Sequence, residues 1–194
     1  MIQVEGLHKQ FGAKKAVEGV SFVARDGEIT GLLGPNGAGK TTTLRMLYTL
    51  LQPDSGHVLI DNIDAHAHSL EVRRRLGVLP DARGLYRRLT ARENIRYYAD
   101  LHGLSAEQAR ERINLLIKTL AMEEIAERRT EGFSQGERLK TAIARALVHN
   151  PSNVLLDEPT NGLDVMSTRS LRDFLRQLKS EGRCVVFPVT SCRR

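Results

Sequence analysis

One glycine-rich segment has the residue types and spacing that bind phosphate groups. Residues 34–41 match G-x-x-x-x-G-K-[ST] at every required position. Glycines let backbone N–H groups approach a phosphate closely, because no side chain blocks them. Lys40 would reach the β- and γ-phosphates of a nucleotide, and the Thr41 hydroxyl would bind Mg²⁺. The predicted nucleotide-binding residues here are Gly34, Pro35, Asn36, Gly37, Ala38, Gly39, Lys40, Thr41 and Thr42.

Two adjacent carboxylates, Asp157 and Glu158, follow the apolar run 153–156. Successive strand residues point to opposite faces, and the chain turns at Pro159, so the two carboxylates are expected to have different roles. We expect Asp157 to hold Mg²⁺ and Glu158 to orient and polarise an attacking water. Alone, this pair would be an ordinary surface turn. Together with the phosphate loop, it predicts a nucleotide hydrolase in which Lys40 and Glu158 are catalytic.

Three short apolar runs, 29–33, 153–156 and 183–187, are expected to form the core strands. Helical periodicity precedes or follows each run, which indicates a parallel α/β sheet covered by helices. A helix over 42–51 is expected to follow the phosphate loop and to complete its context. Residues 2–25 alternate apolar and polar side chains, which favours an antiparallel sheet beside this core.

Residues 81–150 differ from the rest because nearly all of them have a helical pattern. The clearest helices are expected over 90–102 and 105–120, with Gly103 ending the first and Ser105 capping the second. This stretch therefore predicts a helical insertion that separates two parts of the α/β core.

Composition indicates a globular protein that works in the cytoplasm. Its 194 residues suffice for one domain with an inserted subdomain. The sequence shows neither a signal-peptide pattern nor an apolar run of the about 18 residues that a membrane-spanning helix needs. We interpret the net charge of +6 as a solvated basic surface. Cys184 is expected to pack in a strand, and the six histidines are expected on the surface, without a metal.

A second set of motifs resembles the ATP-binding cassette (ABC) family. Phe133-Ser134-Gln135-Gly136-Glu137 and the helix after it, 138–147, resemble the family's signature motif and helix, just upstream of the acidic strand. Residues 161–164 resemble its D-loop, and Phe11 matches the aromatic residue that stacks on adenine. This resemblance covers the chain as far as Phe187, and within the family it points to the bacterial sodium-exporter (NatA-like) branch.

The resemblance implies the fold class and the domain organisation. The expected fold is α/β, a P-loop NTPase (RecA-like) core with a flanking antiparallel β-subdomain, an inserted helical subdomain and the C-terminal part of the core missing. Residues 1–194 would form a single nucleotide-binding domain. Its core would comprise 1–80 and 151–187, its helical subdomain 81–150, and an aberrant tail 188–194.

The resemblance also implies ligands and partners. ATP and Mg²⁺ would be the cofactors, with Phe11 and Val17 added to the nucleotide-binding set and Asp81 joining Thr41 and Asp157 as metal ligands. The signature residues Ser134, Gln135 and Gly136 would contact ATP held by a second cassette, either an identical or a related chain. A membrane-spanning permease would dock at residues 83–90 and hold the cassette on the inner face of the cell membrane. No nucleic-acid partner is expected.

Three positions in these motifs depart from the family pattern. Gln135 stands where the family usually has Gly, Glu137 where it often has Gln, and Asp81 where it usually has Gln. Moreover, Ser134 and Glu137 have the spacing of a capping box, which starts helices with or without a ligand. Residues 83–90 are equally well explained as a solvated arginine-rich loop.

The C-terminal residues 187–194, Phe-Pro-Val-Thr-Ser-Cys-Arg-Arg, differ from what this branch would be expected to have. One base removed from codons for Phe-Ser-Ser-His-Ile-Met-Gln-Glu-Val reproduces these eight residues. We therefore hypothesise a one-base frameshift, genetic or from sequencing; the alternative is a genuine short tail. Reading the neighbouring frame beyond Phe187 for a His-Ile-Met continuation decides between them.

A frameshift would remove the family's switch histidine and the segments that cover the sheet. Such catalytic contacts are worth about 10²–10³ in rate, and an uncovered sheet edge favours aggregation. The function expected from the sequence is that of an ATP-binding and ATP-hydrolysing subunit of an exporter, which powers transport through ATP-driven dimerisation. The alternatives are a non-catalytic remnant that binds ATP but hydrolyses it poorly, and a soluble cassette that acts on nucleic acid.

Overall fold

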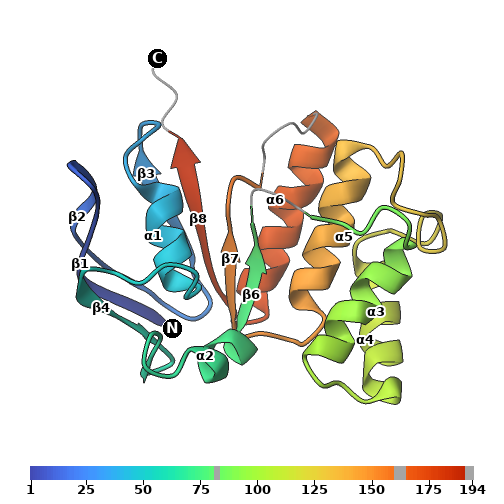
Figure 1. The fold of residues 1–194 in the computed structure, drawn as a ribbon. Helices are drawn as coiled ribbons and strands as arrows, with labels where there is room; N and C mark the ends of the chain where they lie inside the picture. Colours follow the sequence, from blue (N-terminus) through green and yellow to red (C-terminus); the bar gives the residue numbers. More distant parts are fainter. Residues whose placement is uncertain (81–83, 160–164, 191–194) are drawn as a thin grey trace.

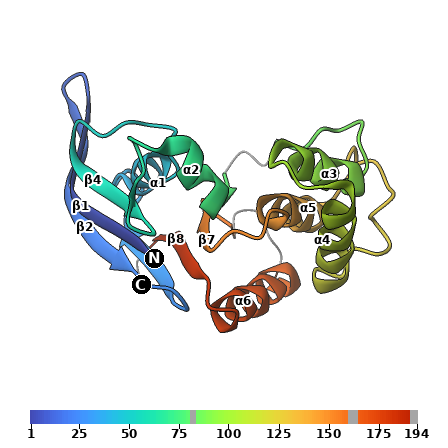
Figure 2. The ribbon, with the colours of Figure 1, turned by 90° about the horizontal axis from the view of Figure 1, so that it is seen from below.

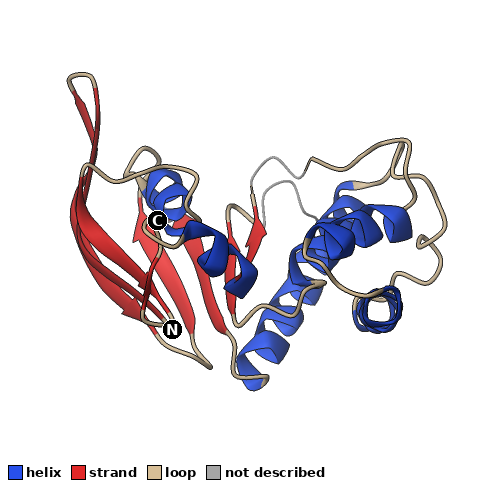
Figure 3. Cartoon of the chain, turned by 60° about the horizontal axis from the view of Figure 1, so that its bottom comes forward, coloured by secondary structure: helices blue, strands red, loops and turns tan. Residues whose placement is uncertain are grey.

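The computed structural model describes residues 1–80, 84–159 and 165–190. Figure 1 shows an antiparallel sheet on one side, a parallel sheet in the middle and a group of helices on the other side. The same three parts follow one another in Figure 3. No helix in these described ranges is both long and apolar enough to cross a membrane.

The antiparallel sheet has the strand order β2-β1-β4-β5. Its strands are β1 (Ile2–Phe11), β2 (Lys14–Ala24), β4 (Ser55–Ile60) and β5 (Ile63–Asp64). Residue Ile2 pairs with Ala24 on one side and with Ile60 on the other. The antiparallel sheet predicted from the alternation of residues 2–25 is confirmed.

The parallel sheet has the order β3-β8-β7-β6 and includes the three predicted core strands. Its strands are β3 (Ile29–Gly34), β6 (Leu76–Leu79), β7 (Asn153–Leu156) and β8 (Cys184–Thr190). All pairs in it are parallel, as expected. β3 is an edge strand of this sheet, and the thiol of Cys184 is buried, which raises its pKa to about 11.

Helix α1 (Lys40–Leu47) joins the two sheets through one hydrophobic cluster. Its Leu44 and Leu47 side chains are fully buried there, together with Ile2 of β1 and Val186 of β8. Burying a side chain of this size stabilises a fold by about 1.5–3 kcal/mol. Apolar side chains of both sheets therefore fix the position of α1, whose first residues follow the phosphate loop.

Helices α3 (Ala91–Leu101), α4 (Ala106–Thr119) and α5 (Gln135–Leu147) form a group that we call the helical unit. The two helices predicted over 90–102 and 105–120 are confirmed. Thr90, Ser105 and Ser134 each begin one of the three helices with a complete capping box. A second hydrophobic cluster joins the helical unit to α6 (Val165–Ser180) and to the parallel sheet. Helix α2 (Ser69–Arg75) leads into β6.

Strand β8 extends three residues beyond the predicted end at Phe187. Pro188 pairs with Leu32 of β3, whereas the pairing with β7 ends at Val186. The N–H of Val185 donates to Glu28 on the β3 side, and by alternation the nitrogen of Pro188 faces the β7 side. Because no β7 residue pairs there, a proline costs this strand no ladder bond.

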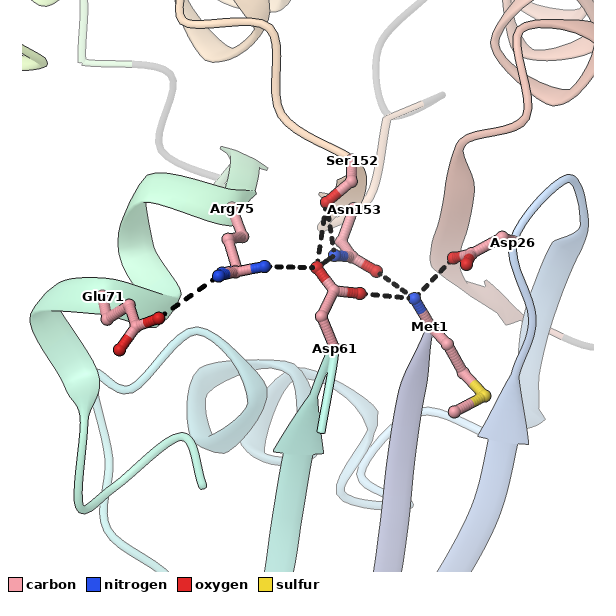
Figure 4. A network of polar contacts seen from close by, with 7 residues as sticks. All are labelled: Met1, Asp26, Asp61, Glu71, Arg75, Ser152 and Asn153. Atoms are coloured by element: carbon pink, nitrogen blue, oxygen red, sulfur yellow. Dashed lines mark hydrogen bonds and ion pairs between the residues drawn. The ribbon is translucent and has the colours of Figure 1, made fainter. Parts of the chain in front are cut away.

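A polar network ties the antiparallel sheet to the start of β7 (Figure 4). The Asp61 carboxylate accepts hydrogen bonds from the Met1 amino group at 2.7 Å and from Asn153 Nδ2 and Ser152 Oγ, each at 3.1 Å. Burial alone would raise the pKa of Asp61, but these bonds outweigh it and the pKa lies below its usual value. Asp61 therefore acts as an ionised link between the two sheets.

Candidate functional site

The phosphate loop lies between β3 and α1, at the carboxyl ends of the parallel strands (Figure 1). A hydrogen bond of 3.2 Å from the Ala38 N–H to the Pro35 carbonyl closes a turn within it. Lys40 Nζ donates to the carbonyls of Gly34 at 2.7 Å and Pro35 at 2.8 Å, so its ammonium group lies against the loop. The predicted residues therefore run from the end of β3 through this turn into the first turn of α1, with the lysine ammonium group against the loop.

Gly39 fits this loop only because it has no side chain. Its φ is +80°, and a Cβ atom there would lie 2.1 Å from the Ala16 carbonyl oxygen. Gly37 also has a positive φ, +84°, but a Cβ atom there would have nothing within 4 Å. The loop is thus packed against β2 at Gly39 and is open at Gly37. An open backbone of this kind lets N–H groups approach a phosphate group.

The structure brings the acidic strand to the start of α1. Thr41 Oγ1 donates a hydrogen bond of 3.2 Å to Asp157 Oδ1, across 116 positions in the sequence. Asp157 is only 3% exposed, and its backbone N–H donates to the Leu79 carbonyl at 2.8 Å. A hydroxyl and a carboxylate oxygen are ligands that Mg²⁺ prefers. The two predicted metal ligands that the structure describes are therefore neighbours.

Glu158 lies differently from Asp157, as expected, but β7 already ends at Leu156, so a turn rather than strand alternation separates the two carboxylates. Its side chain is exposed whereas that of Asp157 is buried. The backbone of Glu158 has a φ of +49°, which non-glycine residues rarely adopt. Such conformations cost about 1–3 kcal/mol and persist where the surrounding structure enforces them. The turn after β7 therefore separates the two carboxylates and presents Glu158 to solvent.

The two residues that the resemblance added to the nucleotide-binding set differ in exposure. Phe11 ends β1 with half of its surface exposed, and Lys9 Nζ lies 5.7 Å from its ring centroid. Val17 is buried, and its Cγ2 would lie 3.1 Å from a Cβ atom at position 39. Phe11 is thus available for stacking, whereas Val17 packs beneath the phosphate loop and supports its shape.

The signature segment forms the start of α5. Ser134 Oγ accepts a hydrogen bond from the Glu137 N–H at 3.2 Å, and Glu137 Oε2 accepts one from the Ser134 N–H at 2.7 Å. Arg128 also pairs with Glu137, at 2.9 Å. The backbone bond from Ser134 is the main reason that the pKa of Glu137 lies below its usual value. The capping box read from the sequence is therefore present, and Ser134 and Gln135 remain exposed at the helix end.

Comparisons with known proteins place these features in a family. A family model described as ABC transporter matches residues 17–161. The ABC transporter ATP-binding protein NatA of Bacillus subtilis is 44% identical over 192 residues, which are 96% of this chain and 78% of NatA. The chain belongs to the ABC transporter family. Its predicted similarity to NatA is confirmed.

Two further comparisons support the assignment of this cassette. The Nod factor export ATP-binding protein I of Ralstonia nicotianae is 38% identical over 188 residues, and the cassette spans 58% of its length. The dimeric ATP-binding cassette MJ0796, in a post-hydrolysis state bound to ADP and Pi, is 29% identical, with a TM-score of 0.86 over 99% of this chain and 88% of that one. The predicted α/β fold of P-loop cassettes is confirmed.

Some predicted residues of the cassette cannot be placed. Asp81, Arg83, the D-loop residues 161–164 and Cys192 lie outside the described residues. Of the expected permease-docking stretch, residues 84–90 are described; Tyr86 is 47% exposed there and packs edge-on against Tyr97, with ring centroids 5.2 Å apart.

Sequence reasoning missed a groove between the α/β core and the helical unit. It has a volume of about 370 Å³. The end of α1 and strand β6 form one wall, and α3 and α5 form the other; its lining includes Tyr48, Leu50, Val78, Tyr98, His102, Arg145 and His149. The guanidinium of Arg145 lies 4.4 Å from the ring centroid of Tyr98, and Leu50 is 69% exposed. The only signal in the sequence was a Tyr, an Arg and two His residues spread over 50 positions, and no local pattern connects them.

The prediction that all histidines lie on the surface is wrong for His149. Its ring Nε2 bonds to the Leu76 carbonyl at 3.0 Å, and its Nδ1 is buried. The ring is stacked on that of His102, so packing between two parts of the fold, which the sequence does not show, determines its surroundings.

Proposed function

We propose that this cassette binds ATP with Mg²⁺ and hydrolyses it as the nucleotide-driven subunit of a transporter. The observation that carries the proposal is the 3.2 Å contact between Thr41 and Asp157, because it unites a phosphate loop with an acidic strand. Each motif alone is compatible with other uses. Together, at the first turn of a helix, they supply the groups that a magnesium nucleotide needs.

Each residue has a distinct role in this proposal. Phe11 stacks on the base, the loop N–H groups and Lys40 bind the phosphates, and Thr41 and Asp157 hold the metal. Bound Mg²⁺ would supply charge neutralisation at the β- and γ-phosphates. Glu158, exposed beside the buried Asp157, orients and polarises the attacking water. The different roles of the two carboxylates follow from the burial of Asp157 and the exposure of Glu158.

A second cassette would complete the site through its signature segment. In Figure 1 the start of α5 lies on the same edge of the molecule as the phosphate loop, with the strands β8, β7 and β6 between them. Two copies arranged head to tail would bring Ser134, Gln135 and Gly136 of each to the nucleotide of the other. The similarity to the dimeric cassette MJ0796 supports this arrangement.

The proposed docking site for a membrane-spanning permease is the stretch 83–90 together with the adjoining groove between the core and the helical unit; Arg145 of the groove donates to the Gly84 carbonyl at 2.9 Å. The groove combines the exposed apolar side chain of Leu50 with the exposed, cationic Arg73, whereas Arg145 is buried in its wall. We propose export as the direction of transport, which the similarity to a Nod factor export protein supports. The site of action would then be the inner face of the cell membrane.

The proposal is tested by measuring nucleotide binding and hydrolysis separately. Lys40→Ala should weaken ATP binding about 100-fold or more, since it removes the ammonium group that lies against the loop. Lys118→Ala, an exposed lysine on α4, is the matched control and should bind as the wild type does. Equal affinity of Lys40→Ala and the wild type would overturn the proposed nucleotide site.

Hydrolysis is tested with Glu158→Gln, which keeps the shape of the side chain and removes its charge. We expect phosphate release to slow by about 10²–10⁴, with ATP binding retained. Glu107→Gln, an exposed residue at the start of α4, should leave the rate unchanged. ATP binding without turnover in the wild type would instead support a chain that binds nucleotide but does not cycle.

A further inference from the structure

Two histidine rings are stacked where the helical unit meets the parallel sheet. His102 follows α3 and His149 lies between α5 and β7; their ring centroids are 3.6 Å apart and their planes differ by 2°. His149 Nε2 also contacts the Leu76 carbonyl at the start of β6, at 3.0 Å. One imidazole therefore connects α3, the end of α5 and β6.

The protonation state of His149 follows from its contacts. A carbonyl can only accept a hydrogen bond, so Nε2 of His149 carries the proton and Nδ1 holds a lone pair. Nδ1 is buried and has no hydrogen-bond partner among the residues that the structure describes. A second proton would have to be placed on Nδ1, where no acceptor is available to bind it. The neutral ring fits this site, and the charged ring does not.

The charged groups around His149 are mostly cationic. Arg112 of α4 donates to the carbonyls of Leu147 at 3.1 Å and Val148 at 3.3 Å, and Arg183 before β8 donates to Asn150 at 2.8 Å. The groove adds Arg73 and Arg145, together with the phenol groups of Tyr48 and Tyr98. The nearby carboxylate of Glu181 is paired with Arg183 at 3.0 Å.

These surroundings disfavour the imidazolium. Burial is the main cause, and His102, Arg112 and Arg183 add repulsion that the Leu76 hydrogen bond does not offset; the pKa of His149 falls to about 4. The pKa of His102 is lowered by burial as well. In an opened conformation, where water reaches the ring, His149 would return towards its usual value of about 6.5.

We propose that His149 is a proton-sensitive joint: the neutral ring, stacked on His102 and bonded to Leu76, holds the helical unit against the parallel sheet, and its protonation releases that contact. The joint needs no ligand to operate. It also forms part of the groove between core and helical unit, so protonation would change the shape of that groove. The effect on permease docking rests on the function proposed above; the joint itself does not.

Hydrogen exchange of the whole chain tests the joint without nucleotide or partner. Between pH 7.5 and pH 5, after correction for intrinsic rates, opening at α3 and at the end of α5 should increase about thirty-fold, the change that a ring with a pKa near 4 when closed and near 6.5 when open produces. Amides of β1 and β2 are the internal reference, and their opening should change much less.

Two variants isolate the histidine. His149→Gln retains an amide donor for the Leu76 carbonyl but cannot titrate, so the increase at α3 should disappear. His57→Gln removes an exposed histidine of the antiparallel sheet and should respond as the wild type does. An unchanged pH response in His149→Gln would overturn the proposal.

A direct titration keeps the proposal testable if His149→Gln does not fold. In the wild type, the imidazole NMR signals of His149 should titrate well below the usual histidine value of about 6.5 and should report the Nε2–H tautomer at neutral pH. A midpoint near 6.5, with the α3 amides unaffected, would show that the ring is not a joint. Neither outcome depends on ATP binding, so failure of the joint would leave the proposed function standing.

Discussion

The amino ends of α1 and α5 differ in how their first-turn N–H groups are used. At α1 the N-cap is Gly39, which offers no side-chain cap. At α5 the N-cap is Ser134, and its capping box with Glu137 uses two backbone donors. The α1 start has no side-chain cap, whereas at the α5 start two backbone donors already bond to side chains of the same helix end.

This difference suggests how the two ends take part in one reaction. An open end needs a ligand to satisfy its N–H groups, so the α1 end is suited to binding phosphate within a single chain. The closed α5 end is stable alone, like the ends of α3 and α4, which have the same box. A phosphate that bonded to the N–H groups of Ser134 or Glu137 would have to replace a capping hydrogen bond, which suits a contact that forms and breaks in each cycle.

A side chain at Gly39, the uncapped start of α1, should have the largest effect on ATP binding. Gly39→Ala forces a side chain into a φ of +80° and against the Ala16 carbonyl. The strained φ alone costs about 1–3 kcal/mol, and we expect ATP affinity to fall about 100-fold. Urea unfolding and a nucleotide titration measure the two effects. At Gly37, where a Cβ atom has open space, Ala should cost only the strain; equal losses at both positions would contradict the account.

Removing the side-chain cap at the start of α5 should have an intermediate effect, on the free energy of unfolding and on ATP hydrolysis. Ser134→Ala and Ser105→Ala remove the same kind of cap, so each should lower the free energy of unfolding by about 1 kcal/mol. Only Ser134→Ala should also slow ATP hydrolysis, by about 10², if its hydroxyl contacts the nucleotide of a partner cassette. Identical turnover in the two variants would mean that the α5 end serves the helix alone.

Protonating Glu137 in the capping box of α5 should have the smallest effect, on the free energy of unfolding. The pKa of Glu137 is lowered in the folded chain, so its stabilising contribution is complete above its unfolded pKa near 4.5 and is lost as the pH falls through the folded value. Glu137→Gln can keep the capping box without titrating. Between pH 6 and pH 4, urea unfolding should therefore show a smaller fall in the free energy of unfolding for Glu137→Gln than for the wild type. An equal fall in both proteins would exclude a stabilising role for the ionised Glu137.

Local patterns in the sequence predicted the phosphate loop, the strand Asn153–Leu156 and two helices of the helical unit. β6 was missed because it is four residues long and contains Gly77. A Cβ atom at Gly77 would lie 2.6 Å from the Ala146 carbonyl of α5 and 2.7 Å from Pro151. That glycine is required by packing across the fold, so no local pattern reveals it.

The remaining differences also arise from distant contacts. α1 was predicted over 42–51, but it ends at Leu47. Thr49, two residues later, has a φ of +62°, which lies outside the helical region. The net charge was interpreted as a solvated basic surface, but Arg112 is partly buried and donates to the carbonyls of Leu147 and Val148 at the end of α5. Within the site, the proximity of Thr41 and Asp157 followed from two recognisable motifs, whereas the groove did not.

The central claim, that the phosphate loop and Asp157 form one magnesium–nucleotide site, is tested most directly by the effect of Mg²⁺ on ATP binding. Mg²⁺ should tighten ATP binding to the wild type by about tenfold or more, and it should have little effect on Asp157→Asn, which preserves the size of the buried side chain. If Mg²⁺ tightened ATP binding equally in both proteins, Asp157 would not hold the metal and the account of the site would be wrong.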